Sequence, residues 1–489
     1  MRQFLGVPFA VPPLGELRFR KPVPAKPWTG VLSTKLNGPA CPQPSTGLDQ
    51  FANVSEDCLY LDVYAPVETP STPLPVVVYF YGGSWEYGDI GGLTGDGIYN
   101  GIYWNNAFPN KAIIVTTNYR LGPFGWLASP LLAKEDPDGS TGNTGLQDQR
   151  LALMWVQKNI AAFGGDPNKV TIWGESAGAG SVSTHLVSPK SWPYFHAAIM
   201  NSGPPANWTA RSLDMAEAHW DRVVTAVGCS AGDVLACMRA QPMETLVKHM
   251  ENLPGELVSF TPVVDGVQLL DIPPQLVRNG SFHNVPVMLG SNLDEGTLFV
   301  PLKPSSSTAD LVKWANFQFG AETASRVLAA YPESDYSSAF VRASALFGDA
   351  AMTCPVRRAA RWITGHGGTT HTYFFTHTWL LIQLFDPSIG VCHGSDLVGA
   401  WDVVVAAIGP GEEKLANQMA SYWSNMVASH NPNSPTTVPV AWPAYNASSD
   451  TNIEFNIPVS TQTGLHSAHC DFWDTIYAEE HPPLSPFSL

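Results

Sequence analysis

Long apolar runs are missing from this chain of 489 residues. No stretch of 18 or more consecutive apolar residues occurs, so we expect no membrane-spanning helix. The opening residues 1–8 also have no apolar stretch long enough for a secretory signal. Gly/Ser tracts, charge runs and internal repeats are absent as well, and we therefore expect a single domain over residues 1–489.

Charged residues are scarce, and most of them are acidic. They make up 14% of the chain, and 42 acidic residues against 26 basic ones leave a formal net charge of -16. This charge repels nucleic acid and anionic membranes, so neither is an expected partner.

Apolar runs of strand-forming residues lie at 75–80, 112–116 and 169–173. Each has the continuous pattern of a strand buried on both faces of a parallel sheet. Apolar residues recur at helical spacing over 148–160, so strand, helix and strand predict a parallel crossover. The second half of the chain predicts helices near 213–227, 309–319 and 413–430, and strands near 285–290 and 370–376.

A glycine-flanked serine follows the third of these strands. Gly174, Glu175, Ser176, Ala177 and Gly178 form a GxSxG motif, and a helix is expected directly after it. The chemistry needs the serine at the tip of a strained turn, where glycines let strand and helix approach closely. GxSxG also occurs by chance as an ordinary small-residue turn, but the strand and helix around it favour Ser176 as a nucleophile.

Two consecutive glycines end the run at 75–80, where residues 82–85 read Gly-Gly-Ser-Trp. Such glycines allow backbone N–H groups to turn inward. We expect the N–H groups of Gly83, Ser84 and Ala177 to form an oxyanion hole, each contributing about 3 to 4 kcal/mol to lowering the barrier. An ordinary glycine turn is the alternative. Trp85 and Glu175 are expected to line the substrate pocket.

Motifs along the whole chain resemble those of the type B carboxylesterases, a family that includes cholinesterases and large fungal lipases. They are GVPFAVPP at 6–13, EDCLYLDV at 56–63, NYRLG at 118–122, FGGDP at 163–167, DEG at 294–296, HGSD at 393–396, WPAY at 442–445 and FW at 472–473. The resemblance implies an α/β-hydrolase fold, with a large, mostly parallel mixed sheet flanked by helices. The N-terminal hairpin usual in that family is expected to be missing.

The resemblance also implies a catalytic triad. The family's acid lies in a GxNxDEG-like segment, which matches 290–296 and assigns Glu295, with Asp294 and Asp396 as rivals. Its base lies in an HG-containing segment, which assigns His393. In this arrangement His393 takes the proton from the serine, and Glu295 fixes the tautomer of the imidazole.

Two positions depart from the family pattern. Ser84 stands where a third oxyanion glycine is usual, and its side chain narrows the room for branched alcohols. Asp396 stands where a glutamate usually follows HGS, and its shorter side chain puts the supporting role of that carboxylate in doubt.

Six of the seven cysteines match disulfides of the family. The resemblance pairs Cys41–Cys58, Cys229–Cys237 and Cys354–Cys470, and leaves Cys392 reduced. Spacing does not fix connectivity, and a bond between Cys354 and Cys392 is the alternative. The first loop is shorter than the lid-like flap of related lipases, and it lacks the tryptophan with which cholinesterases bind a quaternary ammonium group. Choline esters and interfacial lipolysis are therefore less expected.

The expected function is hydrolysis of uncharged carboxylic esters, of small molecules or lipids, through an acyl-enzyme and without a metal or organic cofactor. A triacylglycerol or sterol-ester lipase is the alternative, and a non-catalytic binding protein of the same fold is a remote one. Paired cysteines and four sequons favour a secreted glycoprotein whose signal segment is absent from this sequence; the sequons begin at Asn53, Asn207, Asn279 and Asn446. We expect a monomer or a homodimer.

Overall fold

The computed structural model describes residues 1–45, 53–68, 70–91, 98–102, 104, 108, 110–250, 256–403 and 406–479. Within them lies a ten-stranded sheet of order β1-β2-β4-β3-β5-β6-β9-β10-β11-β12. The strands are β1 (Arg2–Pro8), β2 (Tyr60–Ala65), β3 (Leu74–Phe80), β4 (Ile113–Thr117), β5 (Gly165–Glu175), β6 (Ala197–Asn201), β9 (Val287–Asn292), β10 (Thr370–Phe375), β11 (Thr451–Phe455) and β12 (Ser460–Thr463). A separate pair consists of β7 (Arg211–Ser212) and β8 (Val263–Val264).

The centre of the sheet is parallel, and its edges are antiparallel. Neighbours from β4 to β11 pair in parallel, whereas β1, β2 and β12 pair antiparallel with their neighbours. The predicted runs at 75–80, 112–116 and 169–173 lie in β3, β4 and β5, and Val76, Val77 and Val78 are fully buried. Burial on both faces explains why these strands read as continuous apolar runs.

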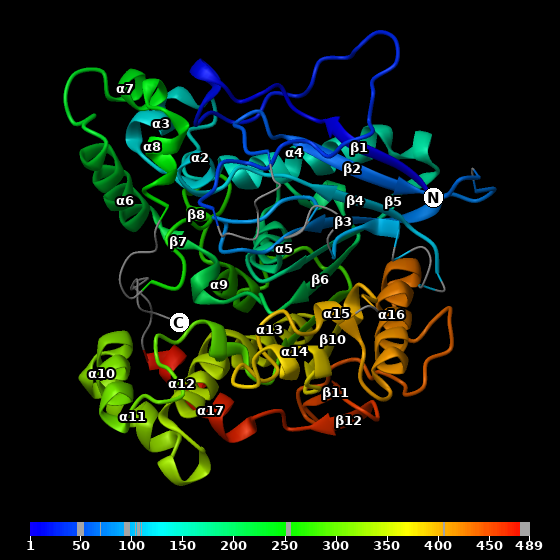
Figure 1. Cartoon of the computed structure of the whole chain (residues 1–489), viewed down its shortest axis with the longest axis vertical. Coiled ribbons are helices and arrows are strands. Elements are labelled where there is room, and N and C mark those ends of the chain that lie inside the picture. The colour runs from blue at the N-terminus through cyan, green and yellow to red at the C-terminus, as the bar shows by residue number, and fades with distance from the viewer. Residues whose placement is uncertain are drawn as a thin grey trace.

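Helices lie around the sheet on several sides of the molecule (Figure 1). The longer ones are α4 (Thr144–Asn159), α5 (Ala177–Val187), α6 (Leu213–Ala226), α10 (Thr308–Phe319), α11 (Ala321–Ala330), α12 (Ala339–Gly348), α13 (Cys354–Gly365), α16 (Glu412–Ser429) and α17 (Ser467–Glu479). The shorter ones are α2 (Gly122–Trp126), α3 (Pro130–Glu135), α7 (Val234–Ala240), α8 (Met243–Val247), α9 (Pro273–Arg278), α14 (Leu380–Phe385) and α15 (Leu397–Ala400). The helices and strands predicted in the second half are all present, with ends shifted by a residue or two. In the described part of the chain, no helix is both long and apolar enough to cross a bilayer.

The disulfides are those that the resemblance implied: Cys41–Cys58, Cys229–Cys237 and Cys354–Cys470. Cys392 is a buried free thiol, so the alternative bond between Cys354 and Cys392 is wrong.

The carboxyl ends of the central strands bring polar residues together. Glu175, Asn201 and Asn292 are the last residues of β5, β6 and β9, which are neighbours in the sheet. In an open parallel sheet, binding sites form at this edge because the loops that follow the strands meet there.

Candidate active site

Ser176 occupies a strained turn between β5 and α5. Its backbone has φ 56° and ψ -127°, in the left-handed half of backbone space that costs a non-glycine residue about 1 to 3 kcal/mol. A Cβ on Gly174 would lie 2.3 Å from the carbonyl carbon of Gly178, and a Cβ on Gly178 would lie 2.0 Å from the carbonyl oxygen of Phe80. Both flanking residues of the motif must therefore be glycine for steric reasons, as predicted.

The loop after β3 lies against this turn. A Cβ on Gly82 would lie 2.8 Å from the carbonyl oxygen of Glu175 and 3.0 Å from Cβ of Ser176. Positive φ angles follow at Gly83 (105°), Ser84 (58°) and Trp85 (56°). No backbone oxygen among the residues that the structure describes accepts a hydrogen bond from the N–H of Gly83 or Ser84.

His393 and Glu295 are in direct contact. Nδ1 of His393 lies 2.5 Å from Oε2 of Glu295, although the residues are 98 positions apart in sequence. Glu295 is fully buried in the turn after β9, and His393 is 9% exposed in the loop before α15. Phe299 packs edge-on against the imidazole, with ring centroids 4.9 Å apart. This pairing occupies Nδ1, so Nε2 is the nitrogen left on the other side of the ring, where the Glu175 carboxylate lies 3.2 Å away.

Three donors besides His393 hold the Glu295 carboxylate. Oε1 accepts hydrogen bonds from the hydroxyl of Ser202 at 2.5 Å, the backbone N–H of Asn292 at 2.7 Å and the side-chain amide of Asn292 at 3.4 Å. Ser202 itself has a positive φ of 53°. Sequence reasoning missed Ser202 and Asn292, although Asn292 is the asparagine of the GxNxDEG segment.

The rival acids have other partners. The carboxylate of Asp294 accepts a hydrogen bond at 2.8 Å from the backbone N–H of Val391 and so fastens the loop that leads to His393. Asp396 is fully buried and accepts hydrogen bonds from the amide of Asn201, at 2.8 Å, and from the hydroxyl of Tyr373.

Glu175 places a second carboxylate next to the imidazole. Its Oε1 lies 3.2 Å from Nε2 of His393, although neither atom has an aligned hydrogen-bond partner among the described residues. A Cβ on Gly82 would lie 2.8 Å from Oε2 of Glu175 as well as 3.0 Å from Cβ of Ser176. The Glu175 carboxylate therefore lies near both Ser176 and His393.

The pKa values of Glu175, His393 and Asp396 are all raised, but for different reasons. Burial raises the pKa of Glu175 to about 7, against the opposing effect of His393. Burial lowers the pKa of His393, but the negative charges of Glu175 and Glu295 outweigh it and raise this pKa to about 9. Burial also raises the pKa of Asp396. The site thus concentrates negative charge around one imidazole.

Trp85 is fully buried. Its indole N–H donates to the hydroxyl of Ser181 at 2.9 Å, and its rings pack against Trp126 and Trp208. Its expected part in a substrate pocket stays a prediction.

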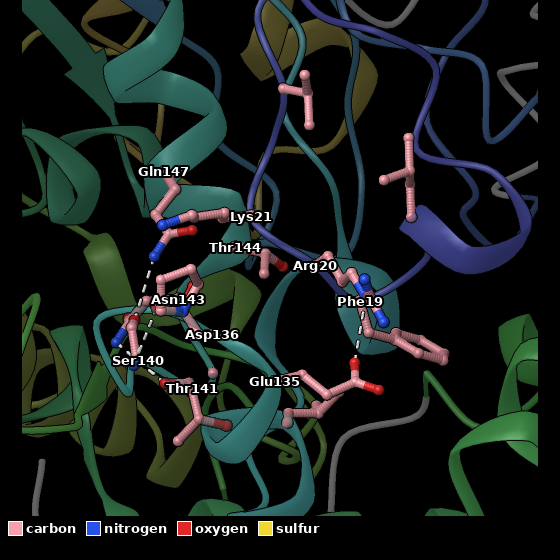
Figure 2. Close-up of a pocket in the computed structure, with 15 residues that line it drawn as sticks. Phe19, Arg20, Lys21, Glu135, Asp136, Ser140, Thr141, Asn143, Thr144 and Gln147 are labelled. Carbon is pink, nitrogen blue, oxygen red and sulfur yellow. Dashed lines mark hydrogen bonds and ion pairs between the residues drawn. The ribbon is translucent and has the colours of Figure 1, made fainter.

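A cavity of about 220 Å³ lies between residues 17–23, the end of α3 and the start of α4 (Figure 2). In it Arg20 faces Glu135, with Nε 3.2 Å from Oε2. None of the fifteen lining residues belongs to the cluster around His393. We therefore assign this cavity no part in the chemistry.

The four sequons differ in exposure. Asn53, Asn279 and Asn446 are exposed, whereas Asn207 is half-buried and its Oδ1 is covered by protein. An oligosaccharide needs an accessible asparagine, so the first three positions suit glycosylation better.

Comparison with known proteins adds an independent finding. The model of the "Carboxylesterase family" matches residues 1–473. Similar curated proteins include the acetylcholinesterases of Bungarus fasciatus (33% identical, covering 96% of this chain and 82% of that protein), Danio rerio (32%, 96% and 84%) and Electrophorus electricus (31%, 96% and 84%). The resemblance inferred from the motifs is confirmed.

Proposed function

Because this chain belongs to the carboxylesterase family and is a carboxylic ester hydrolase of the α/β-hydrolase fold, we propose that Ser176, His393 and Glu295 are its catalytic triad. The observation that carries the proposal is the 2.5 Å contact between Nδ1 of His393 and the buried carboxylate of Glu295. A carboxylate there keeps the proton on Nδ1, so that Nε2 can accept the proton of a serine hydroxyl.

The reaction proceeds in two steps. Nε2 of His393 takes the proton of Ser176 while Oγ attacks the ester carbonyl, and the alcohol leaves with that proton to give an acyl-enzyme. Water, deprotonated by the same nitrogen, then releases the acid and restores the serine. Glu295 stays ionised and stabilises the imidazolium in each step.

The oxyanion of each tetrahedral intermediate is bound by backbone N–H groups of Gly83, Ser84 and Ala177. Ala177 is the first residue of α5, where N–H groups have no acceptor within the helix. Gly83 and Ser84 have positive φ angles and belong to the loop after β3, which lies against the turn that carries Ser176. Preorganised donors of this kind each lower the barrier by about 3 to 4 kcal/mol.

We propose uncharged carboxylic esters as the substrates. The relatives are named acetylcholinesterases, but the segment between Cys41 and Cys58 contains no tryptophan to bind a quaternary ammonium group. A hydrolysis profile across acyl chain lengths and alcohol groups, measured above and below micelle formation, separates an esterase from a lipase. Preference for acetylcholine over a neutral ester of equal size would contradict this assignment.

We also propose that the protein is secreted. Three disulfides suit an oxidising compartment, and three exposed sequons suit glycosylation. Expression of the full-length gene product, with mass analysis of the medium, tests both points.

The test of the triad is Ser176→Ala. We expect kcat to fall by several orders of magnitude, on the order of 10⁴- to 10⁶-fold, with folding unchanged. Ser183→Ala is a matched control, because Ser183 is a buried serine of α5, the helix that follows Ser176, and its Oγ has no hydrogen-bond partner in the described structure. An organophosphate should label Ser176 alone, as read by mass spectrometry of a digest. Substantial turnover by pure Ser176→Ala would refute the assignment.

A further inference from the structure

Away from the active site, two histidines meet a second buried carboxylate. Among the residues that the structure describes, Asp349, His466 and His469 bring one ligand atom each within 4.8 Å of one another. Asp349 begins a π-helical turn, Asp349–Thr353, whereas His466 directly precedes α17 and His469 lies in its first turn. None of these residues has a part in the proposed ester hydrolysis.

Both imidazoles point the same nitrogen at the carboxylate. Nδ1 of His466 lies 2.6 Å from Oδ1 of Asp349, and Nδ1 of His469 lies 3.2 Å from Oδ2. The Asp349 side chain is 4% exposed, whereas the two histidine side chains are 30% and 31% exposed. The carboxylate thus lies in the interior, and the imidazoles lie at the boundary with solvent.

Tyr331 and Trp473 hold the Asp349 carboxylate in place through hydrogen bonds. The hydroxyl of Tyr331 donates to Oδ2 of Asp349 at 2.8 Å, and the indole N–H of Trp473 donates to that hydroxyl at 2.8 Å. The ring of His469 stacks on Tyr331 with centroids 4.1 Å apart. Hydrogen bonds that fix a ligating carboxylate are typical of metal sites.

The backbone at two of the three residues is unusual. His466 has a positive φ of 43°, and Asp349 starts a π-helical turn. Strained residues and π-turns inside helices recur at functional sites.

We propose that Asp349, His466 and His469 form a Zn²⁺ site. Two imidazole nitrogens and one carboxylate oxygen are a ligand set that Zn²⁺ prefers, with water as the fourth ligand from the exposed side. Metal–ligand distances of about 2.0 to 2.2 Å put tetrahedral ligand atoms about 3.3 Å apart. Nδ1 of His469 lies 3.2 Å from Oδ2 of Asp349, which is close to that separation. The 2.6 Å contact of His466 is to the other oxygen, Oδ1, so a small shift of the carboxylate or of the His466 ring is needed before one oxygen and both nitrogens surround an ion.

The ion would act as a cross-link. It joins the turn that carries Asp349 to the start of α17. The disulfide Cys354–Cys470 makes a neighbouring link, from the first residue of α13, directly after that turn, to α17. Zn²⁺ therefore stabilises the docking of α17 and takes no part in the attack on the ester.

Zn²⁺ binding to the whole protein at pH 7.5 is the test, since the imidazoles must be neutral to bind. After treatment with EDTA and dialysis, calorimetry with Zn²⁺ should show one site per chain and an upward shift of Tm, with no comparable response to Mg²⁺ or Ca²⁺. His466→Gln and His469→Gln should each weaken binding by at least about 10-fold, because loss of a direct ligand costs more than loss of an orienting group.

His366→Gln is the matched control, because His366 is an exposed histidine outside the cluster. It should bind Zn²⁺ as the unaltered protein does. The proposal is overturned if the unaltered protein takes up no stoichiometric Zn²⁺, or if both cluster variants bind Zn²⁺ as tightly as the control.

Discussion

Two histidine–carboxylate clusters in this molecule use the same contact for different ends. In one, Nδ1 of His393 lies 2.5 Å from Glu295; in the other, Nδ1 of His466 lies 2.6 Å from Asp349. Three carboxylates, those of Glu175, Glu295 and Asp396, raise the pKa of the single imidazole in the first cluster. The second has two imidazoles around one carboxylate and opens to solvent. An excess of acidic groups suits proton transfer, whereas an excess of imidazoles suits binding of a cation.

The strongest test of this comparison is to neutralise Glu295, the proposed acid of the buried cluster. Glu295→Gln removes the charge that fixes the tautomer of His393, and we expect kcat to fall by on the order of 10³- to 10⁴-fold. Asp294→Asn and Asp396→Asn should each lower kcat much less. The carboxylate of Asp294 contacts Val391, and that of Asp396 contacts Asn201 and Tyr373. Steady-state kinetics of the three variants measures the order. A larger loss in the Asp396 variant would move the acid assignment to Asp396.

The same chemical change in the other cluster should act mainly on stability. Asp349→Asn leaves two histidines without a buried anion, and we expect about 1 to 3 kcal/mol less free energy of unfolding, measured in urea with EDTA present. The free energy of unfolding lost in this variant should be larger than the activation free energy that corresponds to any fall in kcat/KM. If kcat/KM falls as far as in Glu295→Gln, the division of roles between the clusters is wrong.

The smallest expected effect is a displaced pH profile. The negative charge of Glu175 raises the pKa of His393, and the base must be neutral to accept a proton. Glu175→Gln removes that charge, so the pKa of His393 falls and the acidic limb of kcat/KM moves to lower pH. Glu217→Gln changes a carboxylate that is only half-buried, on α6, and serves as the control. A shift to higher pH in the Glu175 variant would show that Glu175 does not act through the charge on His393.

Local signals were sufficient to predict the centre of the fold and the glycine-flanked turn that carries Ser176. Runs such as Val76, Val77 and Val78 are apolar because both faces of the strand are covered, and the steric demands at Gly174 and Gly178 are met within a few residues of Ser176. Such features depend on residues that are close together in sequence, so a local pattern is enough to predict them.

The proposed acid and base could be assigned only through resemblance. Asp294 and Glu295 are neighbours with similar chemistry, and only the packed loop shows that one carboxylate faces Val391 and the other His393. The cluster of Asp349 and His466 was missed for the same reason, since the partners are 117 positions apart and no local pattern joins them.

The thiol of Cys392 can report how often the loop that carries His393 opens. Cys392 is the one cysteine outside the three disulfides, it is 7% exposed, and burial raises the pKa of its thiol. A thiol reagent can therefore reach it only when this loop opens, so the labelling rate at saturating reagent equals the opening rate of the segment. Acylation of Ser176 by a slow substrate would then be read as a change in that rate, at a position one residue away from the proposed base.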